Sequence, residues 1–272
     1  KQSDEYKGYL MENLRRNVVR KSREVYAGYR ILNRDFDRRN LDAVIDILGW
    51  CSRNMKDPKM LHYVLEIEDD EIFTTNRFTQ KFKERFNSYI RKHNRERNKK
   101  FSSKRTKLPE VQLIFSIESK FLSLEVPVPY LHLHLMVVTD TNNHDYSFKE
   151  LNIAVNRALS EIPGLESLTF DPKRTVFFKD TQERQYGFLK FRNTNSSVKI
   201  GEFKQLYGHD LKTELPDAVC RASYLCKLDQ KDLLPEKFKR GNSFGHTRPK
   251  GISRPTAKLS QSIPIGSQLD FL

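Results

Sequence analysis

The sequence predicts an α+β fold, with a central antiparallel sheet of about five strands flanked by helices and an N-terminal helical extension. Segments that alternate between apolar and polar residues, as strands do, are separated by segments with helical spacing. Two of the strand-like segments are joined by a short connection, which favours antiparallel pairing. Apolar residues make up 37% of the 272 residues, which is enough for a core between sheet and helices.

Residues 1–57 are predicted to form the N-terminal helical extension. Apolar and basic residues recur at helical spacing over its first part. A second helix is expected to begin with Asn40 as its N-cap and to end at Gly49. These residues precede a Lys-Asp-Pro turn, which marks the start of the main domain.

Residues 58–240 are predicted to form the main domain, and residues 241–272 a flexible tail. Strands are expected within 60–70, 111–118, 130–140, 167–170, 174–180 and 185–192. Helices are expected at 78–100, 148–164 and 215–231, with residues 201–208 as a short helix or loop. Ser147 suits the N-cap of the middle helix and Gly164 its end. The tail is rich in Gly, Ser, Pro and Lys, which is typical of extended or disordered segments.

The charge balance predicts a polyanionic partner. Lys and Arg total 49 against 35 acidic residues, giving a formal net charge of +14. Such an excess favours nucleic acid or an anionic membrane, although a solvated basic surface would also account for it. No apolar run approaches the roughly 20 residues that cross a bilayer. We therefore expect no membrane partner.

Cysteine usage predicts a reducing compartment. The three cysteines are odd in number and none form a Cys-x-x-Cys pair, which argues against a disulfide framework or a zinc knuckle. We expect a cytoplasmic location.

The densest positive charge lies at the end of the helix predicted over 78–100 and in the loop after it. Residues 91–107 hold nine Lys or Arg and one Glu. We interpret this cluster as a DNA-backbone contact rather than a solvated loop. The candidate DNA-binding residues are Arg91, Lys92, Arg95, Arg97, Lys99, Lys100, Lys104, Arg105 and, further along the chain, Lys231.

Two histidines stand out in the strand "YLHLHLMVV". Alternation along a strand puts His132 and His134 on one face, about 6.5–7 Å apart at Cα, while the leucines between them face the other way. Burying two imidazoles is costly unless their nitrogens find partners. The pair therefore favours a metal site.

A hard cation also needs an oxygen ligand. Glu118 is our first candidate, because it ends the alternating strand that precedes the histidines. Glu125 in the connection, and Glu66 and Glu68 in the first strand, remain alternatives.

A second group of residues lies in "RASYLCK". Tyr224 and Lys227 are three residues apart, which places them on one face of a helix, with Lys231 a further turn along. A tyrosine becomes a useful nucleophile beside a metal-bound phosphate and an ammonium.

A His-hydrophobic-His strand followed about 90 residues later by a Tyr-x-x-Lys helix resembles the HUH endonuclease superfamily. "RASYLCKLDQK", with "FGHTR" further on, resembles more closely the replication initiators of filamentous phages, over roughly residues 60 to 248. The resemblance implies an HUH- or RRM-like sheet, a Mg²⁺ or Mn²⁺ ion on His132 and His134, and Tyr224 attacking single-stranded DNA or an origin hairpin. The product is a 5′-phosphotyrosine that starts rolling-circle replication, with Lys227 positioning the phosphate or the tyrosine. A relaxase or transposase would share this chemistry.

The chain ends in "GSQLDFL", which resembles peptides that dock in the bacterial sliding clamp. In that mode Gln268 is held by hydrogen bonds, while Leu269, Phe271 and Leu272 supply apolar side chains for a pocket. An ordinary apolar chain end is the alternative.

Two rival functions use other chemistry. A non-catalytic RRM-like module would explain the positive charge, but it gives no reason for His132 and His134 together. A zinc hydrolase acting on RNA or nucleotides would use the same histidines, because imidazole suits zinc.

Overall fold

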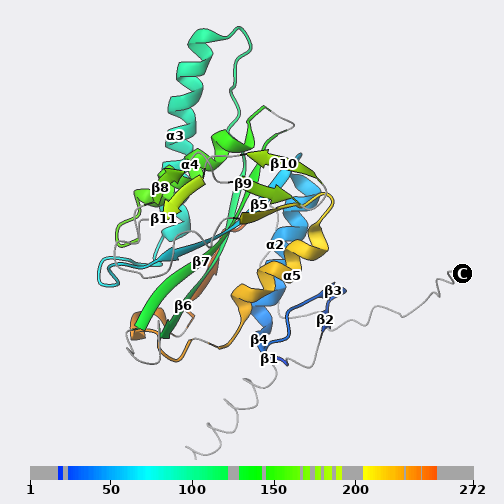
Figure 1. The fold of residues 1–272 in the computed structure, drawn as a ribbon, viewed down its shortest axis with the longest axis vertical. Helices are drawn as coiled ribbons and strands as arrows, with labels where there is room; N and C mark the ends of the chain where they lie inside the picture. The colour runs from blue at the N-terminus through cyan, green and yellow to red at the C-terminus, as the bar shows by residue number, and fades with distance from the viewer. Residues whose placement is uncertain are drawn as a thin grey trace, which may run out of the picture.

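The computed structural model describes residues 18–20, 24–121, 129–142, 145–165, 168–171, 175–178, 181–185, 188–191, 205–229, 231–239 and 241–249. Its fold is α+β, as predicted, with an antiparallel sheet between helices (Figure 1). Among the described helices, none has both the length and the apolar character needed to cross a bilayer.

Within the described residues, the main sheet has seven strands in the order β10-β9-β12-β5-β7-β6-β13. The five from β12 to β13 are antiparallel neighbours, which confirms the expected number, and β9 extends the sheet by pairing with β12 in parallel. The strand bounds are β5 Pro58–Glu66, β6 Val111–Phe121, β7 Pro129–Asp140, β9 Thr175–Phe178, β10 Thr181–Gln185, β12 Gln205–Asp210 and β13 Phe244–His246. A separate ribbon pairs β8 (Leu168–Asp171) with β11 (Phe188–Phe191).

Period-two alternation along β5, β6 and β7 gives the sheet two buried faces. One face carries Leu133 and Leu135 of β7 and packs under α3 (Phe78–Lys100) and α4 (Phe148–Ser160). The apolar stripe of α3 comes every fourth residue, from Phe78 to Ile90. Figure 1 shows the far end of α3 extending away from the sheet.

The opposite face carries Met136 and Val138 of β7 and packs under α2 (Arg38–Asn54) and α5 (Leu215–Ser223). These two helices lie side by side (Figure 1). Since His132 and His134 have the same parity as Met136, they also lie on this second face.

The prediction that residues 1–57 are helical throughout is wrong for the part that the structure describes. Only α2 is an α-helix there, and short strands precede it: β1 Val18–Val19, β2 Val25–Tyr26, β3 Tyr29–Arg30 and β4 Phe36–Asp37. β2 and β3 form a hairpin across Ala27 and Gly28, which both have positive φ (48° and 82°). Such a two-residue turn matches the twist of paired strands.

The bounds predicted for α2 also need correction. Its N-cap is Asp37, whose carboxylate accepts hydrogen bonds from the backbone N–H groups of Arg39 and Asn40. The helix runs through Gly49, because Cys51 continues the buried stripe and an interior glycine costs only about 1 kcal/mol.

Three further segments differ from their predicted structure. Residues 205–210, expected as helix or loop, form strand β12 in the middle of the sheet. Residues 244–246, predicted to belong to the flexible tail, form edge strand β13 on β6. The helix expected over 215–231 ends at Ser223, where a 3₁₀ turn, η1 (Tyr224–Cys226), begins.

The middle helix, α4, starts at the predicted N-cap, Ser147, whose hydroxyl accepts a hydrogen bond from the backbone N–H of Glu150. It ends at Ser160, earlier than predicted, and Gly164 lies beyond it with φ +80°.

Candidate metal centre beside Tyr224

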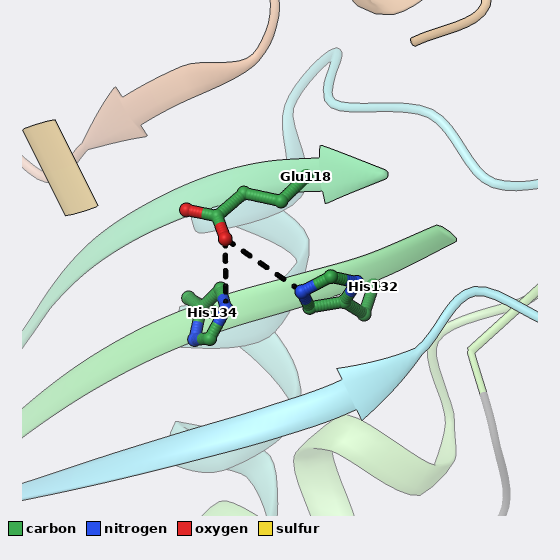
Figure 2. A group of neighbouring side chains, drawn as sticks. All are labelled: Glu118, His132 and His134. Atoms are coloured by element: carbon green, nitrogen blue, oxygen red, sulfur yellow. Dashed lines mark ion pairs between the residues drawn. The ribbon is translucent and has the colours of Figure 1, made fainter. Parts of the chain in front are cut away.

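Glu118, His132 and His134 converge on the second face of the sheet (Figure 2). In the β6–β7 ladder Glu118 pairs with His132 and Ser116 with His134, so the three functional side chains share one face. Oε2 of Glu118 lies 3.0 Å from Nε2 of His134 and 3.6 Å from Nε2 of His132. All three side chains are buried.

The carboxylate of Glu118 is held in its charged form. Burial acts to raise its pKa, but the His132 and His134 rings and the ammonium of Lys227 outweigh burial and keep the pKa well below its ordinary value. Lys227 Nζ lies 2.8 Å from Oε2. A buried carboxylate that stays ionised can bind a cation at neutral pH.

Each histidine presents Nε2 to the carboxylate because its Nδ1 is held from behind. Nδ1 of His132 lies 3.2 Å from the carbonyl oxygen of Tyr130 on its own strand. Nδ1 of His134 lies 3.0 Å from Nε2 of His62 on β5. The sequence gives His62 no role, because no second histidine stands near it at strand or helix spacing. Alternation along β5 does place His62 on the same face as Met60. Only the strand order β5-β7-β6, however, brings that face of β5 beside His134.

Burial perturbs the two hydrogen-bonded rings. It lowers the pKa of His134 despite the nearby Glu118 carboxylate, and it lowers the pKa of His62 further still, with His134 as the next cause. Both rings are therefore neutral at neutral pH, the form in which imidazole binds metal.

The three residues fit a divalent metal ion. Oε1 and Oε2 of Glu118 and Nε2 of His134 are buried atoms that make no hydrogen bond, although Oε2 lies within ion-pair distance of its neighbours. Adjacent ligands about 2.1 Å from a small octahedral cation are about 3 Å apart, close to the distances from Oε2 to the two rings. Glu118, His132 and His134 could therefore hold such an ion.

The alternative oxygen ligands are less well placed, or not described. Glu66 pairs with His132 across the β5–β7 ladder but is not part of the converging group, and Glu68 is exposed beyond the end of β5. Glu125 lies outside the described residues.

Tyr224 lies beside His134. Their ring centroids are 4.9 Å apart, and the centroid of His62 lies 6.5 Å from that of Tyr224. Lys227 Nζ lies 3.7 Å from the centroid of the Tyr224 ring. Tyr224 and Lys227 thus lie beside the Glu118–His132–His134 group, at the start and just past the end of the 3₁₀ turn η1 rather than on a continuous helix.

The 3₁₀ turn η1 after α5 directs Lys227 toward the sheet. Lys227 is extended and forms an isolated antiparallel bridge with Phe36, and the N–H of Leu228 donates to the carbonyl oxygen of Asp35. The N-terminal segment thus braces the chain next to the site. Leu228, directly after Lys227, is exposed because the helix has already ended.

Lys231 also lies against the site instead of on an exposed helix face. Its ammonium donates to Ser116 Oγ at 2.6 Å and to the carbonyl oxygen of Ile117 at 2.5 Å. Burial lowers the pKa of Lys231 to about 8, opposed by the nearby Glu118 carboxylate. This lysine therefore supports the strand that carries Glu118.

The basic cluster follows the far end of α3 and the loop after it. Six of its candidate cations are exposed: Arg91, Lys92, Arg95, Lys99, Lys100 and Lys104. Of these, Lys99 also pairs with Glu96 at 3.2 Å and Lys104 donates to the carbonyl oxygen of Phe101 at 3.0 Å. The other two are only partly exposed: Arg97 donates to the carbonyl oxygen of Ser103 at 2.8 Å, and Arg105 pairs with Glu150 at 2.6 Å.

The candidate clamp-binding residues Gln268, Leu269, Phe271 and Leu272 lie outside the described residues. Comparisons of the chain with protein-family models, with curated proteins and with solved structures find no match.

Proposed function

We propose that this protein is a metal-dependent endonuclease and strand transferase that nicks single-stranded DNA, or an origin hairpin, to initiate rolling-circle replication. Tyr224 is the proposed nucleophile, and a 5′-phosphotyrosine is the intermediate. A relaxase or a transposase would use the same residues in the same way, and differ in the DNA that it joins.

The observation that carries this proposal is the position of Tyr224 against the metal group. Its ring lies 4.9 Å from the His134 ring between centroids, with Lys227 Nζ 3.7 Å from the Tyr224 centroid. A nucleophile, a cation and a carboxylate–histidine group thus lie within reach of one phosphodiester. A non-catalytic binding module needs no such group.

The residues of the chain have distinct roles in the proposed step. The phenolic oxygen of Tyr224 loses its proton and bonds to phosphorus, while the bond from phosphorus to the 3′ oxygen breaks and that oxygen gains a proton. Lys227 stabilises the negative charge on the phosphate. Because the new ester keeps the bond energy, a 3′-OH can reverse the step and rejoin DNA.

The ion is proposed to be Mg²⁺ or Mn²⁺, held by Glu118, His132 and His134. When bound, such an ion polarises the scissile phosphate and neutralises developing charge. The buried, ionised Glu118 and the rings of His132 and His134 supply a hard oxygen and two nitrogens, a mixture that suits Mn²⁺.

Covalent capture tests the proposal. The protein is incubated with Mn²⁺ and a labelled library of random single-stranded DNA, and the products are resolved on a denaturing gel. We expect a DNA–protein adduct and a fragment with a free 3′-OH. Tyr224→Phe should abolish the adduct while DNA binding stays nearly unchanged, whereas Tyr89→Phe, on α3, should retain it.

Three results would count against the proposal. They are an adduct formed by Tyr224→Phe, cleavage that is undiminished in His134→Ala, and DNA binding without any cleavage under Mg²⁺ or Mn²⁺.

A further inference from the structure

His62 and His134 form a buried contact between neighbouring strands. Nε2 of His62 lies 3.0 Å from Nδ1 of His134, and the two ring centroids are 5.2 Å apart. In the β5–β7 ladder His134 pairs with Val64, so His62 reaches it diagonally along the same face. Both residues are more than nine-tenths buried.

The protons of this pair are constrained. A neutral imidazole has one N–H and one lone pair, so the two nitrogens of His134 have opposite roles. Nε2 of His134 faces Glu118 Oε2 and makes no hydrogen bond. If its proton lies on Nδ1, that N–H donates to His62 Nε2, and the lone pair on Nε2 is free for a ligand.

His132, the other histidine of the proposed metal site, is held by a different kind of contact. Nδ1 of His132 faces the carbonyl oxygen of Tyr130, and a carbonyl oxygen can only accept. A backbone carbonyl therefore holds Nδ1 of His132, whereas Nδ1 of His134 is held by a side chain that could be replaced.

We infer that His62 is a positioning residue for His134: it accepts a hydrogen bond from the proton-bearing Nδ1 of His134 and so aims the Nε2 lone pair at the metal position beside Glu118. This inference rests on the proposed metal site. Partners behind a ligand histidine change metal affinity because they hold its tautomer and ring orientation.

Metal binding tests the inference on the full chain. Mn²⁺ is titrated and the free ion is measured by electron paramagnetic resonance. The amide oxygen of glutamine takes nearly the place of His Nε2, whereas the asparagine oxygen falls short of it. We expect His62→Gln to keep the affinity, and His62→Asn and His62→Leu to weaken it by about 10- to 100-fold.

A second readout follows the hydrogen bond itself. Long-range ¹H–¹⁵N spectra of the protein saturated with Mg²⁺, which is diamagnetic, report the Nδ1 proton of His134. We expect that proton to resonate downfield and to exchange slowly with water in wild type and in His62→Gln, and to lose both features in His62→Leu. Circular dichroism establishes that each variant is folded. Met60→Leu is the control, because Met60 lies on the same face of β5 outside this contact.

The outcomes separate the two hypotheses. Wild type that binds neither Mn²⁺ nor Mg²⁺ would overturn the metal part of the proposed function and, with it, the role of His62. Wild-type Mn²⁺ affinity in both His62→Asn and His62→Leu, or an unchanged Nδ1 proton of His134 in His62→Leu, would overturn the role of His62 alone.

Discussion

The ammonium of Lys227 lies 2.8 Å from Oε2 of Glu118, and both side chains are almost completely buried. The carboxylate oxygen that faces both histidines is therefore also the oxygen that pairs with the lysine. A metal ion and the Lys227 ammonium would compete for the negative charge of Glu118, since both are cations directed at the same atom.

Lys227→Met should destabilise the metal-free protein by about 3–5 kcal/mol, because it leaves the Glu118 charge buried without its cation. Added Mn²⁺ should restore more stability to this variant than to wild type, since the ion no longer competes with an ammonium. Urea unfolding in EDTA and in Mn²⁺ measures both effects.

The control for this prediction is Lys239→Met. Lys239 pairs with Glu236 at 2.7 Å on the surface, where an ion pair contributes at most about 1 kcal/mol. Equal urea midpoints for Lys227→Met and wild type in EDTA would contradict the prediction.

Acid should destabilise the metal-free protein from about pH 6.5 downward. Burial lowers the pKa values of His62 and His134 below the unfolded value of 6.5, so in this range the unfolded chain binds more protons than the folded one. The stabilisation is present above pH 6.5 and is lost as the pH falls through the folded pKa values. Urea unfolding between about pH 7.5 and pH 5.5 measures the slope.

His62→Gln removes one of the two titrating rings, so its free energy of unfolding should fall less steeply over the same pH range. A slope identical to that of wild type would show that His62 does not titrate differently on folding.

Replacing Arg95, Lys99 and Lys100 with Gln should weaken binding of single-stranded DNA. All three are exposed at the far end of α3. The slope of log K against log salt should become shallower by about 0.7 for each phosphate that the variant no longer neutralises. Fluorescence anisotropy at several salt concentrations measures it. Arg53→Gln with Lys56→Gln, near the end of α2, removes two charges elsewhere and is the control for net charge. An equal effect per removed charge in that pair would argue against a local interaction with DNA.

Gly164→Ala should destabilise the protein by about 2–4 kcal/mol. Gly164 has φ +80°, and an added Cβ would lie 2.5 Å from the carbonyl oxygen of Asp69. Gly28→Ala separates the cost of the positive φ from the cost of the close contact, because Gly28 has φ +82° with no atom within 4 Å of the added Cβ. Thermal unfolding should show the smaller loss of stability for Gly28→Ala; equal losses would mean that the contact with Asp69 has no effect.

Local backbone geometry made much of the site predictable. The pleat of a strand requires His132 and His134 to share a face, and a short connection predicts that the Glu118 strand is their neighbour. The apolar spacing that ends at Ile90 likewise identified α3 and its exposed basic end. These features depend on periods of two and 3.6 residues, which a single sequence displays.

The sequence by itself therefore determined the strand parity, the histidine pair and the basic helix, with Glu118 as the first of several candidate carboxylates. The tertiary structure alone decided that β5 lies beside β7, which brings His62 to His134, and that η1 turns Lys227 inward against Glu118. The tertiary structure alone also decided the antiparallel backbone bridge between Phe36 and Lys227. The physical reason is that these contacts join segments far apart in the chain, and their formation depends on the packing of a whole sheet rather than on local conformational preference.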